Sequence, residues 1–260
     1  MVHTLFSNDV YLDKDTHQYF DKDGKEYMSF TRFFSFLSPK FDANMIAAAT
    51  AKRDDTTKEA VLGKWQATAD EGTRLDKTLK AYSQTGKIIP EGEGLEQVVR
   101  EVSKKYVDYH RCYEDLVVFS KDYRVAGEID KLSLTSNRRN CTFHISDFKR
   151  FEGGMTYEAK GQRFLNYPLD YLPNTKYVKI SFQLSFYAYL FEQLTNHKCE
   201  KLFIDLVIPQ IANGVVVGHK NEVIPVNYMK REIEFCLEHF SNRVITALDG
   251  RKYEQIEDEF

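Results

Sequence analysis

The chain has 260 residues, of which 42% are hydrophobic and 29% are charged, a balance typical of a globular protein with a substantial core. No signal peptide and no apolar run of the roughly 18 residues needed for a membrane span is present, so we expect an intracellular protein without a membrane partner. The net charge of −3 excludes a uniformly basic nucleic-acid coat protein, so any contact with phosphates must come from a local cluster of Lys and Arg. The four cysteines lack CxxC spacing, which argues against a zinc site and against an iron–sulfur cluster.

The first half of the chain is predicted to be a β-meander followed by helices. Turn signals at 13–15 and 21–24 separate short runs such as 17–20 and 26–30, which indicates a meander over 1–30. The region 31–110 reads as mainly helical. Asp42 can cap a helix over 43–52, Thr57 can open a longer helix to about residue 82, and an apolar stripe indicates a third helix over 95–110.

The second half, 111–260, alternates strands and helices and is predicted to be the catalytic core. Strands are expected over 115–120, 123–134 and 141–149, followed by an amphipathic helix over 178–195. Two strands (201–209 and 214–223) and a helix over 227–248 complete the chain. This order predicts an α/β fold with a mixed central β-sheet flanked by helices. Because no repeat or linker interrupts the sequence, we expect one domain over 1–260.

The clearest functional pattern lies on the hairpin predicted around residues 130 and 147. The polar turn TSNRRN (135–140) joins the strands over 123–134 and 141–149. If the turn is centred between residues 138 and 139, Asp130 lies opposite Asp147. Lys149 points to the same side as Asp147, because side chains two residues apart in a strand share a face. The sequence therefore predicts two carboxylates and an ammonium on one patch.

Such a patch has two interpretations. Paired carboxylates are oxygen ligands suited to Mg²⁺ or Mn²⁺, which activate water and neutralise phosphate charge during hydrolysis. A neighbouring lysine can orient or deprotonate the water, or stabilise charge in the transition state. The alternative is an ordinary salt bridge on a hairpin, since an isolated Asp-x-Lys tripeptide is common. The surrounding motifs favour catalysis.

These motifs carry a resemblance to a known family. The segments GEID (127–130) and ISDFK (145–149) resemble the G-x-x-D and h-x-D-x-K core of PD-(D/E)XK nucleases. Gln183 and Tyr187, one helical turn apart, resemble the Q-x-x-x-Y motif of the RecB-like branch. Trp65 and EGTRLD (71–76) are similar to the W…G-x-x-x-H helix of phage-type and mitochondrial genome-maintenance exonucleases. The resemblance, over about 28–195, implies a restriction-endonuclease-like core with the catalytic residues Asp130, Asp147, Lys149, Gln183 and Tyr187.

The same resemblance implies two further metal ligands. Where the exonucleases carry a histidine, this chain has Asp76, which is a competent ligand for a hard ion. Asp76 is equally compatible with a solvated helix residue or with a substitution that weakens the enzyme. Glu114 lies where many relatives carry an additional acidic residue. The implied ligands of Mg²⁺ or Mn²⁺ are Asp130, Asp147, Asp76 and Glu114.

The segment 150–179 joins the predicted catalytic strand to the helix that carries Gln183. Its length and weak periodicity are typical of a functional connection in a compact domain. Basic residues alternate in it with aromatic residues, which suits phosphate contacts and base stacking on single strands. A surface loop that packs its own aromatic side chains would give the same pattern. The candidate DNA-binding residues are Arg150, Lys160, Arg163, Lys176 and Lys179.

We therefore expect a metal-dependent deoxyribonuclease whose partner is DNA, at its ends or as single strands. The resemblance favours an exonuclease of replication, recombination or repair, and a phage origin, because the chain is a compact nuclease without a helicase region. Two alternatives stay open. One is a structure-specific endonuclease. The other is a catalytically weak nucleic-acid-binding module of the same fold, which Asp76 in place of histidine would favour.

Overall fold

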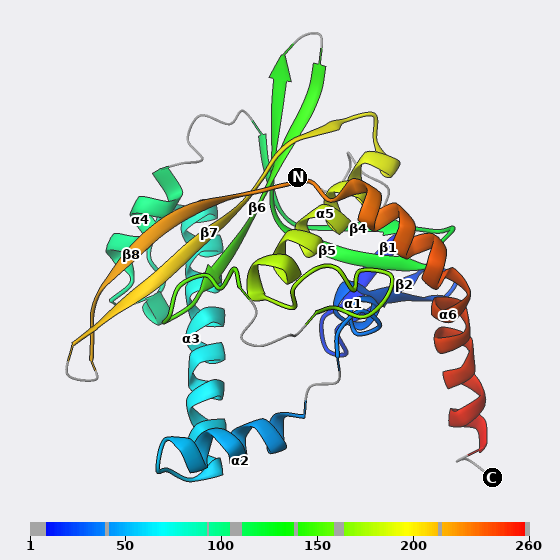
Figure 1. The fold of residues 1–260 in the computed structure, drawn as a ribbon. Coiled ribbons are helices and arrows are strands. Elements are labelled where there is room, and N and C mark those ends of the chain that lie inside the picture. The colour runs from blue at the N-terminus through cyan, green and yellow to red at the C-terminus, as the bar shows by residue number, and fades with distance from the viewer. Residues whose placement is uncertain are drawn as a thin grey trace.

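The computed structural model describes residues 9–39, 42–92, 94–104, 111–137, 140–158, 164–212 and 215–257. A mixed β-sheet forms the centre of the molecule, and helices cover both of its faces (Figure 1). The elements follow the predicted order, so the α/β class with a mixed sheet is confirmed. Within these ranges, none of the helices combines the length and the apolar character required to cross a bilayer.

The sheet is built from eight strands in the described residues. They are β1 (Val10–Asp13), β2 (Gln18–Asp21), β3 (Glu26–Ser29), β4 (Arg111–Ser120), β5 (Val125–Asn137), β6 (Asn140–Arg150), β7 (Lys198–Ala212) and β8 (Val215–Val226). Their order is β1-β2-β3-β5-β6-β7-β8, with β4 paired to the other edge of β5. The β3–β5 and β6–β7 pairs are parallel, and the remaining pairs are antiparallel. The N-terminal meander is therefore an extension of the main sheet.

Strand β5 has an unusual arrangement of neighbours. Along one edge, β4 pairs with it from Val125 to Leu134. On the opposite edge, β3 pairs only with Val125 and Ala126, whereas β6 pairs from Lys131 onward. Strands β3 and β6 thus diverge at 127–130, where β5 has no strand neighbour on that edge. Functional groups on this segment can be reached without crossing the sheet.

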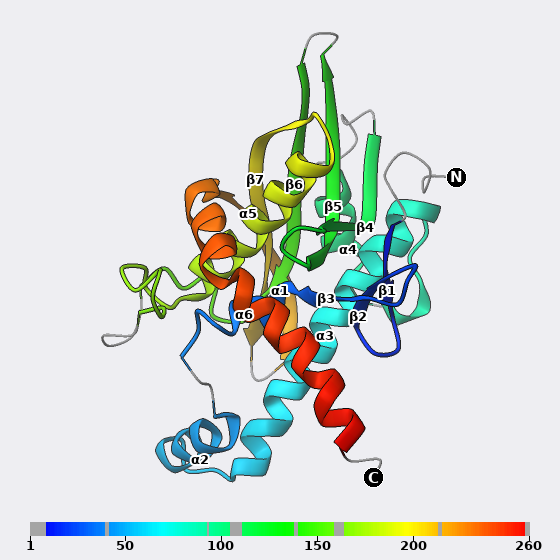
Figure 2. The same ribbon diagram turned by 90° about the vertical axis from the view of Figure 1, so that its right-hand side faces the viewer.

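Helix α5 (Lys176–Leu194) packs on one face of the sheet beneath α6 (Lys230–Glu257), as Figures 1 and 2 show. The Thr175 hydroxyl accepts a hydrogen bond from the backbone N–H of Val178, which caps the start of α5. The helix predicted over 178–195 is confirmed, but its predicted amphipathic character was wrong, because most of α5 is buried on all sides between the sheet and α6. Phe182, Phe186 and Phe191 are fully buried in the resulting core.

The other face is covered by α3 (Lys58–Thr85) and α4 (Glu96–Lys104), and α2 (Ala43–Arg53) and the short 3-10 helix η1 (Pro90–Gly92) pack against α3. Helix α1 (Phe30–Phe34) instead packs with α5 and α6 on the first face. Thr57 caps α3 through its side chain, and Gly86 ends the helix with a φ of 67°, a conformation that glycine adopts without strain. Leu75 and Leu79 of α3 form a second core with α4 and the sheet. This packing places the polar side of α3 beside the middle of β4, where Lys80 meets Asp115.

Several predicted boundaries were wrong. Helix α6 extends to Glu257 rather than to residue 248, and β7 begins at Lys198 and ends at Ala212 rather than covering 201–209. Strand β4 begins at Arg111 rather than at residue 115, because it pairs with β5 as far as Leu134. The helix predicted over 95–110 is α4, Glu96–Lys104; residues 105–110 lie outside the described residues, and Arg111 is already in a strand. Charged residues at the start of β4 obscured its strand pattern, and pairing with β5 decided the structure there.

Candidate active site

The two carboxylates predicted to face each other are in contact. The β5–β6 ladder runs from Asn137–Asn140 to Lys131–Ser146, so the turn is centred where the sequence placed it. Asp130 and Asp147 come next along the two strands, and their carboxyl groups are close enough for a hydrogen bond between them to contribute to the raised pKa of Asp130. Asp147 is only 3% exposed, whereas Asp130 keeps partial access to solvent. The pair lies where β3 and β6 diverge.

Burial and mutual repulsion control the charge of this pair. Burial is the main reason that the pKa of Asp130 rises from 3.8 to about 8, and the charge and hydrogen bond of Asp147 add to the rise. Asp130 therefore carries a proton at neutral pH in the absence of a cation. A group of opposite charge that entered here would displace this proton.

Lys149 supplies the positive charge of the site, with its Nζ 2.6 Å from Oδ2 of Asp147. Burial alone would lower the pKa of Lys149, but the charges of Asp147 and Asp130 raise it above its ordinary value. Lys149 is therefore an ammonium at neutral pH in this arrangement. It is suited to orienting groups or stabilising negative charge, and poorly suited to removing a proton.

Gln183 and Tyr187 lie above β5. Nε2 of Gln183 donates a hydrogen bond to the hydroxyl of Tyr187 over 3.0 Å. The Tyr187 ring rests on Gly127, where a Cβ atom would collide with Cε1 and lie 2.9 Å from Cδ1. Burial raises the pKa of Tyr187, and the charges of Asp130 and Asp147 contribute to the rise, so the phenol lies within electrostatic range of both carboxylates. The glycine of the GEID segment is required by this close packing.

Helix α3 brings Asp76 toward the pair together with a lysine. Oδ2 of Asp76 lies 2.9 Å from Nζ of Lys80, and the same Nζ lies 2.7 Å from Oδ1 of Asp115 on β4. We call Asp76, Lys80 and Asp115 the Lys80 bridge. Burial raises the pKa of Asp76; Lys80 opposes the rise, and the charges of Asp130 and Asp115 add to it. Asp76 is thus part of the same electrostatic cluster as Asp130.

Glu114, the other implied ligand, makes an ion pair with Lys131 at 3.5 Å across the β4–β5 ladder. Its neighbour Asp115 is the β4 carboxylate that joins the Lys80 bridge. The backbone of Asp115 has a φ of 53°, in the left-handed region that aspartate tolerates better than most residues. Nothing in the sequence pattern distinguished Asp115 from Glu114.

Three of the candidate DNA-binding residues make contacts within the protein. Arg150 has a side chain only 5% exposed and pairs with Glu71 of α3. Nζ of Lys176 lies 4.0 Å from the ring centroid of Phe151, and Nζ of Lys179 lies 5.9 Å from that of Phe34. Lys176 and Lys179 remain exposed to solvent. The other two candidates, Lys160 and Arg163, lie outside the described residues.

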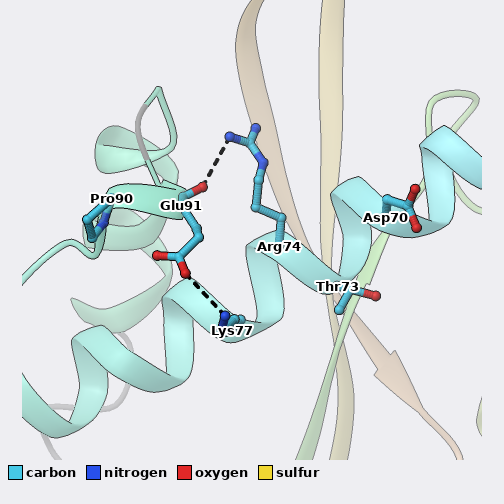
Figure 3. Close-up of a pocket in the computed structure, with 6 residues that line it drawn as sticks. All are labelled: Asp70, Thr73, Arg74, Lys77, Pro90 and Glu91. Carbon is cyan, nitrogen blue, oxygen red and sulfur yellow. Dashed lines mark hydrogen bonds and ion pairs between the residues drawn. The ribbon is translucent and has the colours of Figure 1, made fainter.

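Sequence reasoning also overlooked a groove of about 640 Å³ between α3 and η1. Figure 3 shows Arg74 and Lys77 on α3, both directed toward Glu91. The Arg74 guanidinium donates to the backbone carbonyl of Glu91 over 3.2 Å, and Lys77 pairs with the Glu91 carboxylate at 3.2 Å. The groove is lined by neither Asp130 nor Asp147, so it is separate from the candidate active site.

The oxygen donors at the site have the chemistry that a hard divalent cation prefers. Asp130 and Asp147 are two carboxylates in contact, and Oδ1 of Asp76 is buried without a hydrogen-bond partner in the described structure. In the described part of the chain, however, no three His, Cys, Asp or Glu side chains are grouped so that they could hold a metal ion. Two ligands therefore fit Mg²⁺ or Mn²⁺, and a third is not yet in place.

Comparison with known proteins gives a distant structural resemblance. No protein-family model and no curated protein matches the sequence. A structure from Eubacterium rectale named "Putative exonuclease" has 13% sequence identity over 86% of this chain and 82% of that chain, with a TM-score of 0.42. The protein SSO0001 has 15% identity over 66% of this chain and 74% of its own, with a TM-score of 0.30. Because both scores lie below 0.5, the chemistry of this chain must be argued from its own residues.

Proposed function

We propose that this chain is a divalent-metal-dependent nuclease of the PD-(D/E)XK type that hydrolyses phosphodiester bonds in DNA. The observation that carries the proposal is the contact between Asp130 and Asp147, with Lys149 beside them, at the divergence of β3 and β6. An ordinary salt bridge joins one acid to one base. Here two carboxyl groups lie beside one ammonium, and keeping both of them ionised costs stability unless a cation compensates their charge.

Each residue of the site has a role in this proposal. Asp130 and Asp147 would hold Mg²⁺ or Mn²⁺, with Asp76 as a third ligand, and Glu114 stays in its ion pair with Lys131. A bound ion of this kind supplies a Lewis acid and lowers the pKa of water. The Lys149 ammonium would stabilise negative charge that develops on the phosphate. Tyr187, held by Gln183, would orient Lys149 or the scissile strand.

Among nuclease activities, we propose that of an exonuclease acting on DNA ends, and the test compares linear with circular DNA. The protein is incubated with each substrate in Mg²⁺ or Mn²⁺, with excess EDTA and with the Asp147→Asn variant as controls. Progressive shortening of linear DNA alone supports an exonuclease, whereas nicking of circles indicates a structure-specific endonuclease. Cleavage that persists in EDTA would refute the metal-dependent mechanism.

One observation favours a second candidate, a nucleic-acid-binding module of the same fold with little catalytic power. Asp76 is paired with Lys80, and within the described ranges no preformed group of three ligands is available for a metal. If the protein retards DNA in a gel without cutting it at any metal concentration, this second candidate replaces the nuclease.

A further inference from the structure

The Lys80 bridge is more than a pair of charges on one helix. Asp76 and Lys80 are four residues apart on α3, which is ordinary spacing for a surface ion pair. Asp115, however, comes from β4 and lies 2.7 Å from the same ammonium. The Lys80 side chain is 21% exposed, so the ammonium is held between a helix and a sheet rather than in free solution. A surface ion pair alone would not bring in a carboxylate from another element.

The ammonium also stands within a wider group of acids. The charge of Lys80 acts on Asp130 and on Glu128, both on β5, in addition to its two direct partners. Lys80 is thus the positive charge on the α3 side of the site, as Lys149 is on the β6 side. The nuclease mechanism proposed above uses Lys149 and leaves Lys80 without a role.

We propose that the Lys80 ammonium binds the Asp76 carboxylate in the metal-free protein in place of a metal ion. This ion pair must break before a divalent ion can gain Asp76 as its third ligand. This inference rests on the proposed function, because it concerns the same metal site. Lys80 is a positioning residue in this scheme: it sets the affinity for the metal and touches neither the phosphate nor the attacking water.

The contacts make this exchange feasible. Lys80 has two carboxylate partners, so its ammonium keeps Asp115 when Asp76 turns away. Asp76 already has one oxygen, Oδ1, that is buried without a hydrogen-bond partner in the described structure. A divalent ion would satisfy that oxygen and carry more charge than the ammonium it replaces. Competition with Lys80 would make metal binding weaker and more readily reversible than three carboxylates alone would allow.

The test is calorimetric titration of Mn²⁺ and Mg²⁺ into the full chain without DNA. Lys80→Met keeps the length of the side chain and removes its charge, and it should bind Mn²⁺ about tenfold or more tightly than the wild type. Lys80→Arg keeps the charge and should behave like the wild type. Lys77→Met removes the same charge one turn away on α3, from the groove in Figure 3, and should leave the affinity unchanged. Adding Asp76→Asn to Lys80→Met should abolish the gain.

Several outcomes would overturn the inference. It fails if Lys80→Met binds Mn²⁺ as weakly as the wild type, or if Lys77→Met tightens binding equally, since the effect would then be one of overall charge. If Lys80→Met does not fold, Lys80→Met with Asp115→Asn restores the charge balance and is titrated instead. Failure of the proposed function looks different: no variant binds metal in a manner that depends on Asp130, and no DNA is cut. Metal binding that is equal with and without Lys80 overturns this inference alone.

Discussion

Replacing Asp130 with asparagine should stabilise the metal-free protein while it abolishes metal binding. Asp130 has a pKa of about 8 in the folded protein, compared with a reference value of 3.8. At pH 7 the unfolded chain carries an ionised Asp130, so folding must either protonate this group or bury its charge, and both are unfavourable. The corresponding cost is at most about 4 kcal/mol. Because Asp130 keeps partial contact with solvent and its surroundings can relax, we expect Asp130→Asn to raise the free energy of unfolding by about 1–3 kcal/mol. The asparagine amide can still donate a hydrogen bond to Asp147.

The pH dependence gives the sharper result. An acid whose pKa is raised by folding does not lower the free energy of unfolding at a pH below its unfolded pKa. As the pH rises from the unfolded pKa toward the folded pKa, the acid lowers the free energy of unfolding by an increasing amount. The stability difference between Asp130→Asn and the wild type should therefore be small at pH 4 and should increase up to about pH 8. Urea unfolding in EDTA at several pH values measures it. Asp70→Asn removes a charge from an exposed position of α3 and serves as the control.

Two results would refute this reasoning. If Asp130→Asn lowers the free energy of unfolding at pH 7, the carboxylate is a stabilising group and not a strained one. If the difference between Asp130→Asn and the wild type is the same at pH 5 and pH 8, the pKa of Asp130 is not raised. Adding Mn²⁺ should stabilise the wild type, because a ligand that binds only the folded state shifts the equilibrium, and it should leave Asp130→Asn unchanged.

Three other predictions follow from the site and its supports. Lys149→Ala should lower turnover on linear DNA roughly 10²- to 10³-fold, as loss of a positioned charge does, with metal affinity unchanged or tighter; turnover at the wild-type rate would show that the lysine has no part in the reaction. Gly127→Ala should lower the free energy of unfolding by about 1–3 kcal/mol, because the added methyl group collides with Tyr187, and calorimetry with Gly63→Ala as the control would measure it. Glu192 is 5% exposed on its side chain and pairs with Lys230 at 2.8 Å; burial raises its pKa, but Lys230 and the backbone N–H of Cys199 outweigh this and lower it. Glu192→Gln should therefore cost about 1–3 kcal/mol near neutral pH, and the cost should disappear as the pH falls below 4.5 through the lowered pKa of the folded state; a cost independent of pH would contradict this.

Local features of the sequence were sufficient to predict the carboxylate pair. The hairpin register follows from a polar turn between two strands. Side chains alternate between the two faces along a strand, so residues two positions apart share a face. Asp130 and Asp147 could therefore be placed opposite each other before any tertiary contact was known. The spacing of Gln183 and Tyr187 likewise predicted their contact, because residues four apart on a helix are neighbours.

Only the tertiary structure decided which further charges surround that pair. Lys80 and Asp115 lie far apart in the sequence and meet because α3 packs beside the middle of β4, which pairs along one edge of β5. The edge of β5 at 127–130 lacks a strand neighbour because β3 pairs with only two residues of β5 and β6 begins to pair at Lys131. Periodicity and turn chemistry act over a few neighbouring residues, so they specify elements and their faces. Contacts between distant elements depend on how whole faces pack, and that information is not contained in any local pattern.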